Sequence, residues 1–264
     1  LNIQKENHIM NELLKMTAHQ IKEGKFDKVI LAIGSCEAHG QHLAEGCDTI
    51  VSYELSKQVA DRVPGMLVLP PITVGYSGHY DTFPFTLTFD YETMIHVIYD
   101  IVESVLRNGI NKIFLMNGHD GNIAPIEIAA RKIKEKYPDA RIASLPEWWV
   151  IAGKLVPEGT FKVWNGLGHA GEGESSIAYH LFPQWCEPDQ ATCVVPDHLP
   201  EHVDIKWDFA EITDTAQTGD ATIATAEKGK LMNDCLVDAV VKDIEELEKT
   251  GWNYNTSHCA TKLK

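Results

Sequence analysis

The feature that most constrains the fold is an alternation of short apolar runs with longer amphipathic segments over the first 145 residues. Four runs have the apolar composition of buried strands: 28–34, 65–72, 112–118 and 140–145. Three segments between them carry apolar residues at helical spacing: 49–63, 91–109 and 124–137. Because strands that are joined through helices by short connections run parallel, the pattern predicts an α/β fold whose parallel sheet is covered by helices on both faces.

The rest of the chain is less regular. Residues 173–182 and about 222–249 again have helical spacing, and the second of these predicts a long closing helix. Between them, residues 183–220 contain four prolines and predict an irregular excursion over the surface. No repeat or linker divides the chain, so we expect one domain over residues 1–264.

Charge and cysteine usage narrow the class of protein. The formal net charge is −15, which argues against nucleic acid or an anionic membrane as a partner, since both attract clustered Lys and Arg. The six cysteines are scattered without a C-x-x-C pair and do not indicate a disulfide framework. Neither a signal peptide nor an apolar segment of about 20 residues is visible. We therefore expect a cytoplasmic protein with reduced thiols.

Four polar, glycine-punctuated clusters adjoin the predicted strands and helices: residues 35–42, 75–83, 117–122 and 168–175. In parallel α/β sheets, ligands bind beyond the carboxyl ends of the strands, so these clusters are expected to converge. Glycine lets the backbone turn sharply enough to aim the side chains at a common point.

The side chains of these clusters are mainly His, Glu and Asp. Imidazole with carboxylate suits Zn²⁺, Mn²⁺, Fe²⁺ or Co²⁺, and a bridging carboxylate suits two metals about 3.5–4 Å apart. A single histidine beside a glycine turn is more often a structural residue, but several such clusters together favour a metal site. Cys36 is an alternative nucleophile without an identifiable partner base, and neither a G-x-S-x-G elbow nor a P-loop is present.

Five segments resemble motifs of one family. Residues 34–48 read GSCEAHGQHLAEGCD and resemble G-S-x-E-x-H-G-x-H-L-x-x-x-x-D, the signature of the creatininase (creatinine amidohydrolase) family. Residues 117–122 (NGHDGN) are similar to its N-G-H-G-G-N motif, and residues 169–176 (HAGEGESS) are similar to H-A-G-E-x-E-T-S. Residues 219–229 (GDATIATAEKG) resemble G-D-P-T-x-A-x-x-x-K-G, and residues 75–86 (GYSGHYDTFPFT) are a weaker match to G-x-S-x-x-H-x-x-F-P-G-T. The matches run in order over most of the chain.

The resemblance implies a three-layer αβα sandwich with a mainly parallel sheet, assembled as a hexamer, with a centre of two divalent metal ions (Zn, Mn or Fe). Carried over position by position, Glu37 and His119 would bind one metal, and His39 and Glu174 would bind the other. Asp48 would bridge the two.

Three further residues receive supporting or catalytic roles from the resemblance. His42 belongs to the signature without being a usual ligand, and we expect it to support the ligands. His169 would face the substrate as a proton shuttle or oxyanion stabiliser, a role that needs a near-neutral pKa. Glu172 would orient His169 or reach the substrate.

The chain departs from the family patterns at positions that concern the substrate. Creatininase is similar to N-G-H-Y-E-N at the third motif, so its substrate-site Glu falls where this chain has Gly121, with Asp120 as a possible substitute. Phe85 replaces the Gly of F-P-G-T and would reshape a pocket wall. Trp148 and Trp164 lie near positions of aromatics that cover the substrate in creatininase, and each could equally be a packing residue.

These residues together predict a two-metal hydrolase of a small polar substrate. In the expected reaction, a metal-bound hydroxide cleaves the C–N bond of a cyclic amide or amidine, as in creatinine hydrolysis. Two other reactions of the family stay open: C–C cleavage that opens an oxidised inositol ring of the dehydro-scyllo-inosose type, and deformylation of a formamide. A homologue that binds metal without catalysis is a further alternative. We expect a homo-oligomer that acts on a small molecule.

Overall fold

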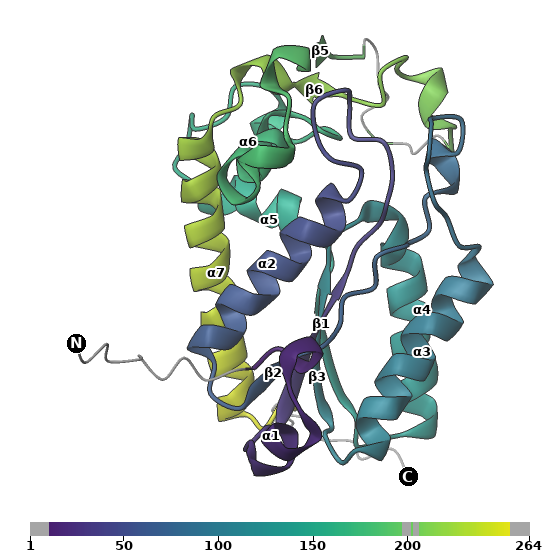
Figure 1. Cartoon of the computed structure of the whole chain (residues 1–264), viewed down its shortest axis with the longest axis vertical. Helices are drawn as coiled ribbons and strands as arrows, with labels where there is room; N and C mark the ends of the chain where they lie inside the picture. The colour runs from purple at the N-terminus through teal and green to yellow at the C-terminus, as the bar shows by residue number, and fades with distance from the viewer. Residues whose placement is uncertain (1–10, 197–201, 203–205, 254–264) are drawn as a thin grey trace.

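The computed structural model describes residues 11–196, 202 and 206–253. Four parallel strands form the central sheet in the order β2–β1–β3–β4 (Figure 1). Their bounds are β1 Lys28–Ile33, β2 Met66–Val68, β3 Lys112–Asn117 and β4 Arg141–Leu145. Every residue of β1 is buried, as expected for a central strand covered on both faces.

Helices cover both faces of this sheet (Figure 1). On one face lie α2 (Cys47–Arg62), α5 (Trp148–Leu155), α6 (Glu172–Leu181) and α7 (Ala226–Lys249), which share a hydrophobic core with alternate strand residues such as Ile30 and Phe114. On the other face, α3 (Tyr91–Arg107) and α4 (Ile123–Lys136) pack on the intervening residues, such as Leu31 and Leu115. The predicted three-layer αβα sandwich with a mainly parallel sheet is confirmed.

Shorter elements complete the structure. Helix α1 spans Ala18–Glu23, and an antiparallel pair is formed by β5 (Cys193–Val194) and β6 (Gly219–Asp220). The described residues also include single-turn 3₁₀ helices: Leu13–Lys15, Gly78–Tyr80, Asp120–Asn122, Trp164–Gly166, Pro183–Trp185, Pro188–Gln190, Phe209–Glu211 and Ala221–Ile223. No helix among the described residues is long and apolar enough to cross a membrane.

The predicted elements between residues 28 and 145 are all present, with one shortened strand and shifted ends. Strand β2 covers only Met66–Val68 of the predicted 65–72, because Pro70 and Pro71 have no N–H to continue the ladder. Helix α5 was not predicted, since its eight residues are apolar almost all round and show no amphipathic spacing.

The irregular excursion predicted for residues 183–220 is partly confirmed. Its described part consists of 3₁₀ turns and the short strands β5 and β6, while residues 197–201 and 203–205 lie outside the described residues. The excursion does more than cover surface, because Trp207 and Phe209 line the cavity described below. The prediction of one domain over residues 1–264 stays a prediction.

Candidate metal centre

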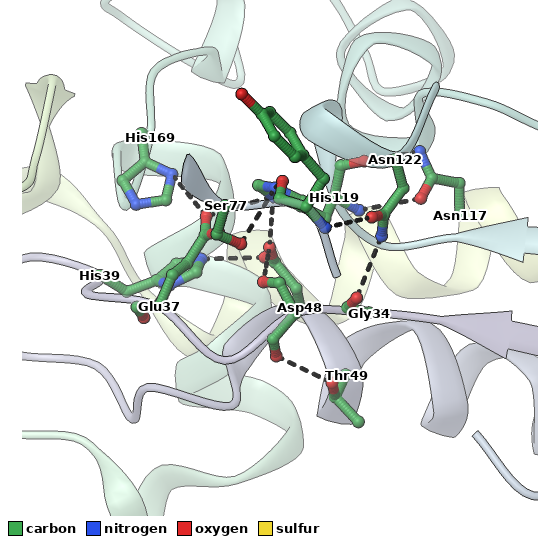
Figure 2. Close-up of polar contacts among 12 residues, drawn as sticks. Gly34, Glu37, His39, Asp48, Thr49, Ser77, Asn117, His119, Asn122 and His169 are labelled. Atoms are coloured by element: carbon green, nitrogen blue, oxygen red, sulfur yellow. Dashed lines mark hydrogen bonds and ion pairs between the residues drawn. The ribbon is translucent and has the colours of Figure 1, made fainter. Parts of the chain in front are cut away.

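Buried carboxylates and imidazoles meet at the carboxyl end of the central strands (Figure 2). Glu37 and His39 follow β1, Asp48 lies in the first turn of α2, and His119 follows β3. His39 Nε2 lies 2.8 Å from Asp48 Oδ1, and His119 Nδ1 lies 3.1 Å from both Asp48 Oδ2 and Glu37 Oε1. The convergence that the sequence predicted for these loops is therefore observed.

Three histidines of the centre are each oriented by a backbone carbonyl. His119 Nε2 lies 2.7 Å from the Tyr76 carbonyl oxygen, His39 Nδ1 lies 3.0 Å from that of Glu37, and His169 Nε2 lies 2.7 Å from that of Ala38. A carbonyl oxygen only accepts, so the facing nitrogen carries the proton and donates it. The other nitrogen of each ring then points toward the carboxylates, which is how metal-ligating histidines are usually held.

Glu37 is the clearest sign that a cation belongs in the centre. Both of its carboxylate oxygens are buried; Oε1 has the 3.1 Å ion-pair contact with His119 Nδ1, and Oε2 has no hydrogen-bond partner among the described residues, although such groups are almost always satisfied in folded proteins. Burial alone would lower the pKa of His39, but the charge and hydrogen bond of Asp48 together with the charges of Glu174 and Glu37 raise that pKa to about 10. Burial likewise opposes the charges of Glu37 and Asp48 at His119, whose pKa is raised well above its usual value. The cluster holds positive charge strongly, and a divalent cation would supply it.

Three overlapping groups among the described residues have ligand atoms within 4.8 Å of one another. They are Glu37, Asp48 and His119; His39, Asp48 and Cys47; and Glu37, His39 and His169. Burial raises the pKa of the Cys47 thiol well above its usual value, so this thiol stays protonated and is a poor ligand. Glu37, His39 and Asp48 each belong to two groups, and Asp48 directs one oxygen toward His39 and the other toward His119.

Glu174 lines the cavity described below from the start of α6 but is not a member of any of these three groups. Its Oε2 accepts a 2.6 Å hydrogen bond from the Ala170 N–H. Burial raises the pKa of Glu174 to about 7, against the opposing charge of His39 and with the support of that of Asp48. A carboxylate that gains a proton so readily lacks a positive partner, and this is consistent with a ligand whose cation completes its environment.

The ligand loops are locked by two asparagines and close backbone approaches (Figure 2). Asn117 donates to the carbonyl of His119 at 2.7 Å and accepts from its N–H at 3.2 Å. Asn122 accepts from the Tyr76 N–H and donates to the Gly34 carbonyl, both at 3.0 Å. At Gly118, an added Cβ would lie 2.4 Å from the Asp48 carbonyl oxygen. The loops after β1 and β3 can approach each other only because glycine stands there.

A cavity of about 280 Å³ opens above the centre, with Asp48, His119, His169 and Glu174 among its lining residues. Its walls are aromatic: His79, Tyr80, Trp149, Trp207 and Phe209. Of these residues, His79 and Tyr80 lie in the segment 75–86 that matches a family motif. For Trp207 and Phe209, the only signal in the sequence is a pair of aromatics within an otherwise polar, irregular segment.

His169 lies at the edge of the centre. Its Nδ1 is 3.9 Å from Glu37 Oε1, and its ring packs against those of His39 and Tyr80 at centroid distances of 4.3 and 4.5 Å. Burial and the charge of His39 lower the pKa of His169 to about 3, which differs from the near-neutral value expected from the sequence. The imidazole is therefore neutral, with its free lone pair on Nδ1.

The prediction that Glu172 orients His169 or reaches the substrate is not supported. Its carboxylate is fully buried and accepts from the Lys228 ammonium at 2.6 Å and from the Lys162 N–H at 2.8 Å. These contacts join α6 to α7 and to the preceding loop. Glu172 therefore stabilises the packing of α6 and lies on the side of this helix opposite Glu174, which lines the cavity.

Neither Trp148 nor Trp164, the two aromatics that the family resemblance places near the substrate, lines the cavity. Trp148 is fully buried in the hydrophobic core, and its neighbour Trp149 lines the cavity instead. Trp164 is 39% exposed and is not among the lining residues. Asp120 does line the cavity, and Phe85 is 87% exposed on the surface rather than in a pocket wall.

Comparisons with known proteins point to one family. A family model named Creatininase, described as creatinine amidohydrolase, matches residues 14–244. The chain is 28% identical to a creatinine amidohydrolase from Pseudomonas putida, over 83% of this chain and 88% of that protein. It is 26% identical to a mycofactocin precursor peptide peptidase from Mycobacterium ulcerans, over 89% and 91% of the two chains.

Solved structures show the same fold. A structure named "Creatininase Mn" has a TM-score of 0.75 and 26% identity, and covers 89% of this chain and 98% of its own. A mutant creatininase of the Zn-Zn type has a TM-score of 0.74 and 27% identity, with 89% and 97% covered.

Proposed function

The chain belongs to the creatininase family of metal-dependent amidohydrolases, and on that premise we propose that it hydrolyses a C–N bond of a small polar substrate with two divalent cations. Glu37 and His119 hold one cation, His39 and Glu174 hold the other, and Asp48 bridges them. The observation that carries this proposal is the buried Glu37 carboxylate, whose Oε2 has no hydrogen-bond partner among the described residues and which lies between imidazoles already oriented by the backbone.

The chain's own residues suit a hydrolysis. When bound, two divalent cations lower the pKa of a water molecule and offset the charge that develops on a substrate oxygen. His169 donates its Nε2–H to the Ala38 carbonyl, so Nδ1 is the ring atom that would take a proton from the attacking water. Because burial and the charge of His39 lower the pKa of His169 to about 3, the ring is a weak base, and its protonated form would readily give that proton to the leaving nitrogen. The aromatic walls keep bulk water away from the reacting groups.

The cavity and the relatives both favour C–N cleavage of a compact group. A volume of about 280 Å³ is at the lower end for ligand pockets, which fits a small molecule better than a long segment of peptide. Creatinine amidohydrolase and the precursor peptide peptidase are both named for reactions that break an amide-type C–N bond. C–C cleavage of an oxidised inositol and deformylation of a formamide are the alternatives, and a substrate panel of creatinine, a dehydro-inosose and a formamidopyrimidine separates them.

Removal of the cations tests the proposal directly. Dialysis against a chelator is expected to abolish hydrolysis of the panel substrate, and re-addition of Zn²⁺, Mn²⁺ or Fe²⁺ is expected to restore it. Elemental analysis of the purified protein should give two ions per chain and rank the three metals. A protein that keeps full activity after chelation, with no bound metal, would overturn the two-cation assignment.

Gly121 sets this chain apart from the creatininase pattern, and restoring the glutamate there should not create creatinine hydrolysis. An added Cβ would lie 2.1 Å from the Tyr76 carbonyl oxygen and 2.6 Å from His119 Nε2, within the contact that orients His119. We therefore expect Gly121→Glu to displace His119 and to weaken metal binding by about 10- to 100-fold, the usual loss when a ligand's orienting partner is disturbed.

Isothermal titration of the chelated protein with Zn²⁺ measures this effect. Asp120→Glu is the matched control, because Asp120 is next to Gly121, is exposed and lines the cavity, and the substitution adds no Cβ to the Tyr76–His119 contact. Unchanged zinc affinity in Gly121→Glu would show that the loop can make room, and the steric argument would be wrong.

A further inference from the structure

A chain of hydrogen bonds links His42, in the loop after β1, to Glu174 in the first turn of α6. His42 Nε2 lies 2.7 Å from Ser175 Oγ, and Ser175 Oγ donates to the Ala170 carbonyl at 3.0 Å. The N–H of the same residue, Ala170, donates to Glu174 Oε2 at 2.6 Å. Because the serine proton is used on the carbonyl, His42 must donate its Nε2–H to the serine oxygen.

Ala170 needs this support because of its backbone. It has a φ of +49° and is completely buried, and only glycine adopts that left-handed region at no steric cost. Ala170 also follows His169, whose own N–H and carbonyl are bonded to Thr218 at 3.0 and 2.8 Å. A turn held in this conformation persists only where its surroundings impose it.

The environment of His42 indicates that its N–H donor matters more than its bulk. The ring is 2% exposed and its Nδ1 is buried without a hydrogen bond, next to Gly40, where an added Cβ would lie 2.6 Å away. An unsatisfied buried nitrogen is destabilising, and an apolar ring of similar size would avoid it. The Nε2–H contact to Ser175 is therefore the feature that distinguishes histidine from phenylalanine at this position.

We propose that His42 is a positioning residue that holds the left-handed peptide of Ala170 through Ser175 and so sets the place of the Glu174 carboxylate. The consequence for metal binding rests on the proposed function, because Glu174 is assigned there to one of the two cations. The consequence for the turn itself does not depend on any cation.

Hydrogen exchange on the metal-free protein tests the turn. His42→Phe and Ser175→Ala are expected to speed exchange in peptides covering residues 167–175 by about tenfold or more, since local protection follows local stability. His42→Gln, whose amide can still donate to Ser175, should stay close to the unmodified protein. Ser176→Ala is the matched control, because this neighbouring buried hydroxyl bonds Glu172 and Thr225 instead.

Backbone strain provides a second arm. In the Ala170→Gly background, His42→Phe should speed exchange less than it does in the natural sequence, because glycine accepts the left-handed conformation unaided. Equal acceleration in both backgrounds, or none in His42→Phe, would overturn the positioning role.

Metal titration separates this inference from the proposed function. Co²⁺ titration followed by absorption is expected to show that His42→Phe weakens one of the two ions by about 10- to 100-fold and leaves the other unchanged. Equal weakening of both ions would contradict a role through Glu174. If the unmodified protein bound no Co²⁺ at all, the proposed function would fail, while the exchange experiment would still decide the role of His42.

Discussion

Asp48→Asn is expected to remove both cations and to lower the hydrolytic rate by more than about 100-fold, which is the upper range for losing only an outer partner of a ligand. Asp48 lies between the two proposed cation positions, with Oδ1 2.8 Å from His39 Nε2 and Oδ2 3.1 Å from His119 Nδ1. Asparagine has nearly the same shape and can still accept from the Ser35 hydroxyl, which lies 2.7 Å from Oδ2. The change therefore removes the charge and one ligand oxygen while it keeps the packing.

Elemental analysis and activity on the panel substrate measure the effect of Asp48→Asn, and circular dichroism checks that the variant is folded. Glu54→Gln is the control on the same helix, because Glu54 pairs only with Lys57 near the surface. If Asp48→Asn kept both ions at the natural affinity, Asp48 could not be the bridge. If it lost one ion only, Asp48 would be a ligand of a single site.

His169→Asn is expected to lower kcat by about 10²- to 10⁴-fold, the usual contribution of a general acid or base. Both cations should remain, because their assigned ligands are untouched. We expect the loss of kcat because Nε2 is fixed by the Ala38 carbonyl, which leaves the lone pair of Nδ1 as the proton acceptor at the edge of the cavity. Asparagine is too short to place an acceptor at that point.

Kinetics and metal content together decide the role of His169. His96→Asn on the exposed side of α3 is the control for a generic loss of imidazole. His169 also lies within 4.8 Å of ligand atoms of Glu37 and His39, so it could be a third imidazole ligand. Loss of one cation in His169→Asn would favour that role and contradict the proton shuttle.

The sequence predicted the sheet and the ligand loops because their signals are local. An apolar run that stops at glycine marks both a buried strand and the turn at its carboxyl end, and the side chains of that turn must lie at the ligand-binding edge. The strand-end clusters that contain Glu37, His39 and His119 were found in this way, whereas their roles as ligands and that of Asp48 came from the resemblance to the family. The structure brings these four residues together.

The predictions that differ from the structure concern side chains whose direction depends on tertiary packing. Along a helix each residue turns about 100°, so Glu172 and Glu174 point to nearly opposite sides of α6. One reaches Lys228 and the other reaches the cavity, which no motif spacing specifies. The same rotation places Trp148 in the core and Trp149 at the cavity.

The aromatic wall from residues 207–209 could not be predicted because it depends on how a long connection folds back over the sheet. The prolines of residues 183–220 indicate that this segment is irregular. They do not indicate which of its residues line the cavity. The hexamer, the cytoplasmic location and the identity of the metals likewise stay predictions.

The three carbonyl contacts that orient the histidines have a consequence for substitution of the side chains around them. The acceptors belong to the main chain at residues 37, 38 and 76, so mutation of the side chains of Ala38 and Tyr76 leaves these acceptors in place. Substitution of these two side chains can therefore alter the surroundings of the centre while the three imidazoles keep their tautomers.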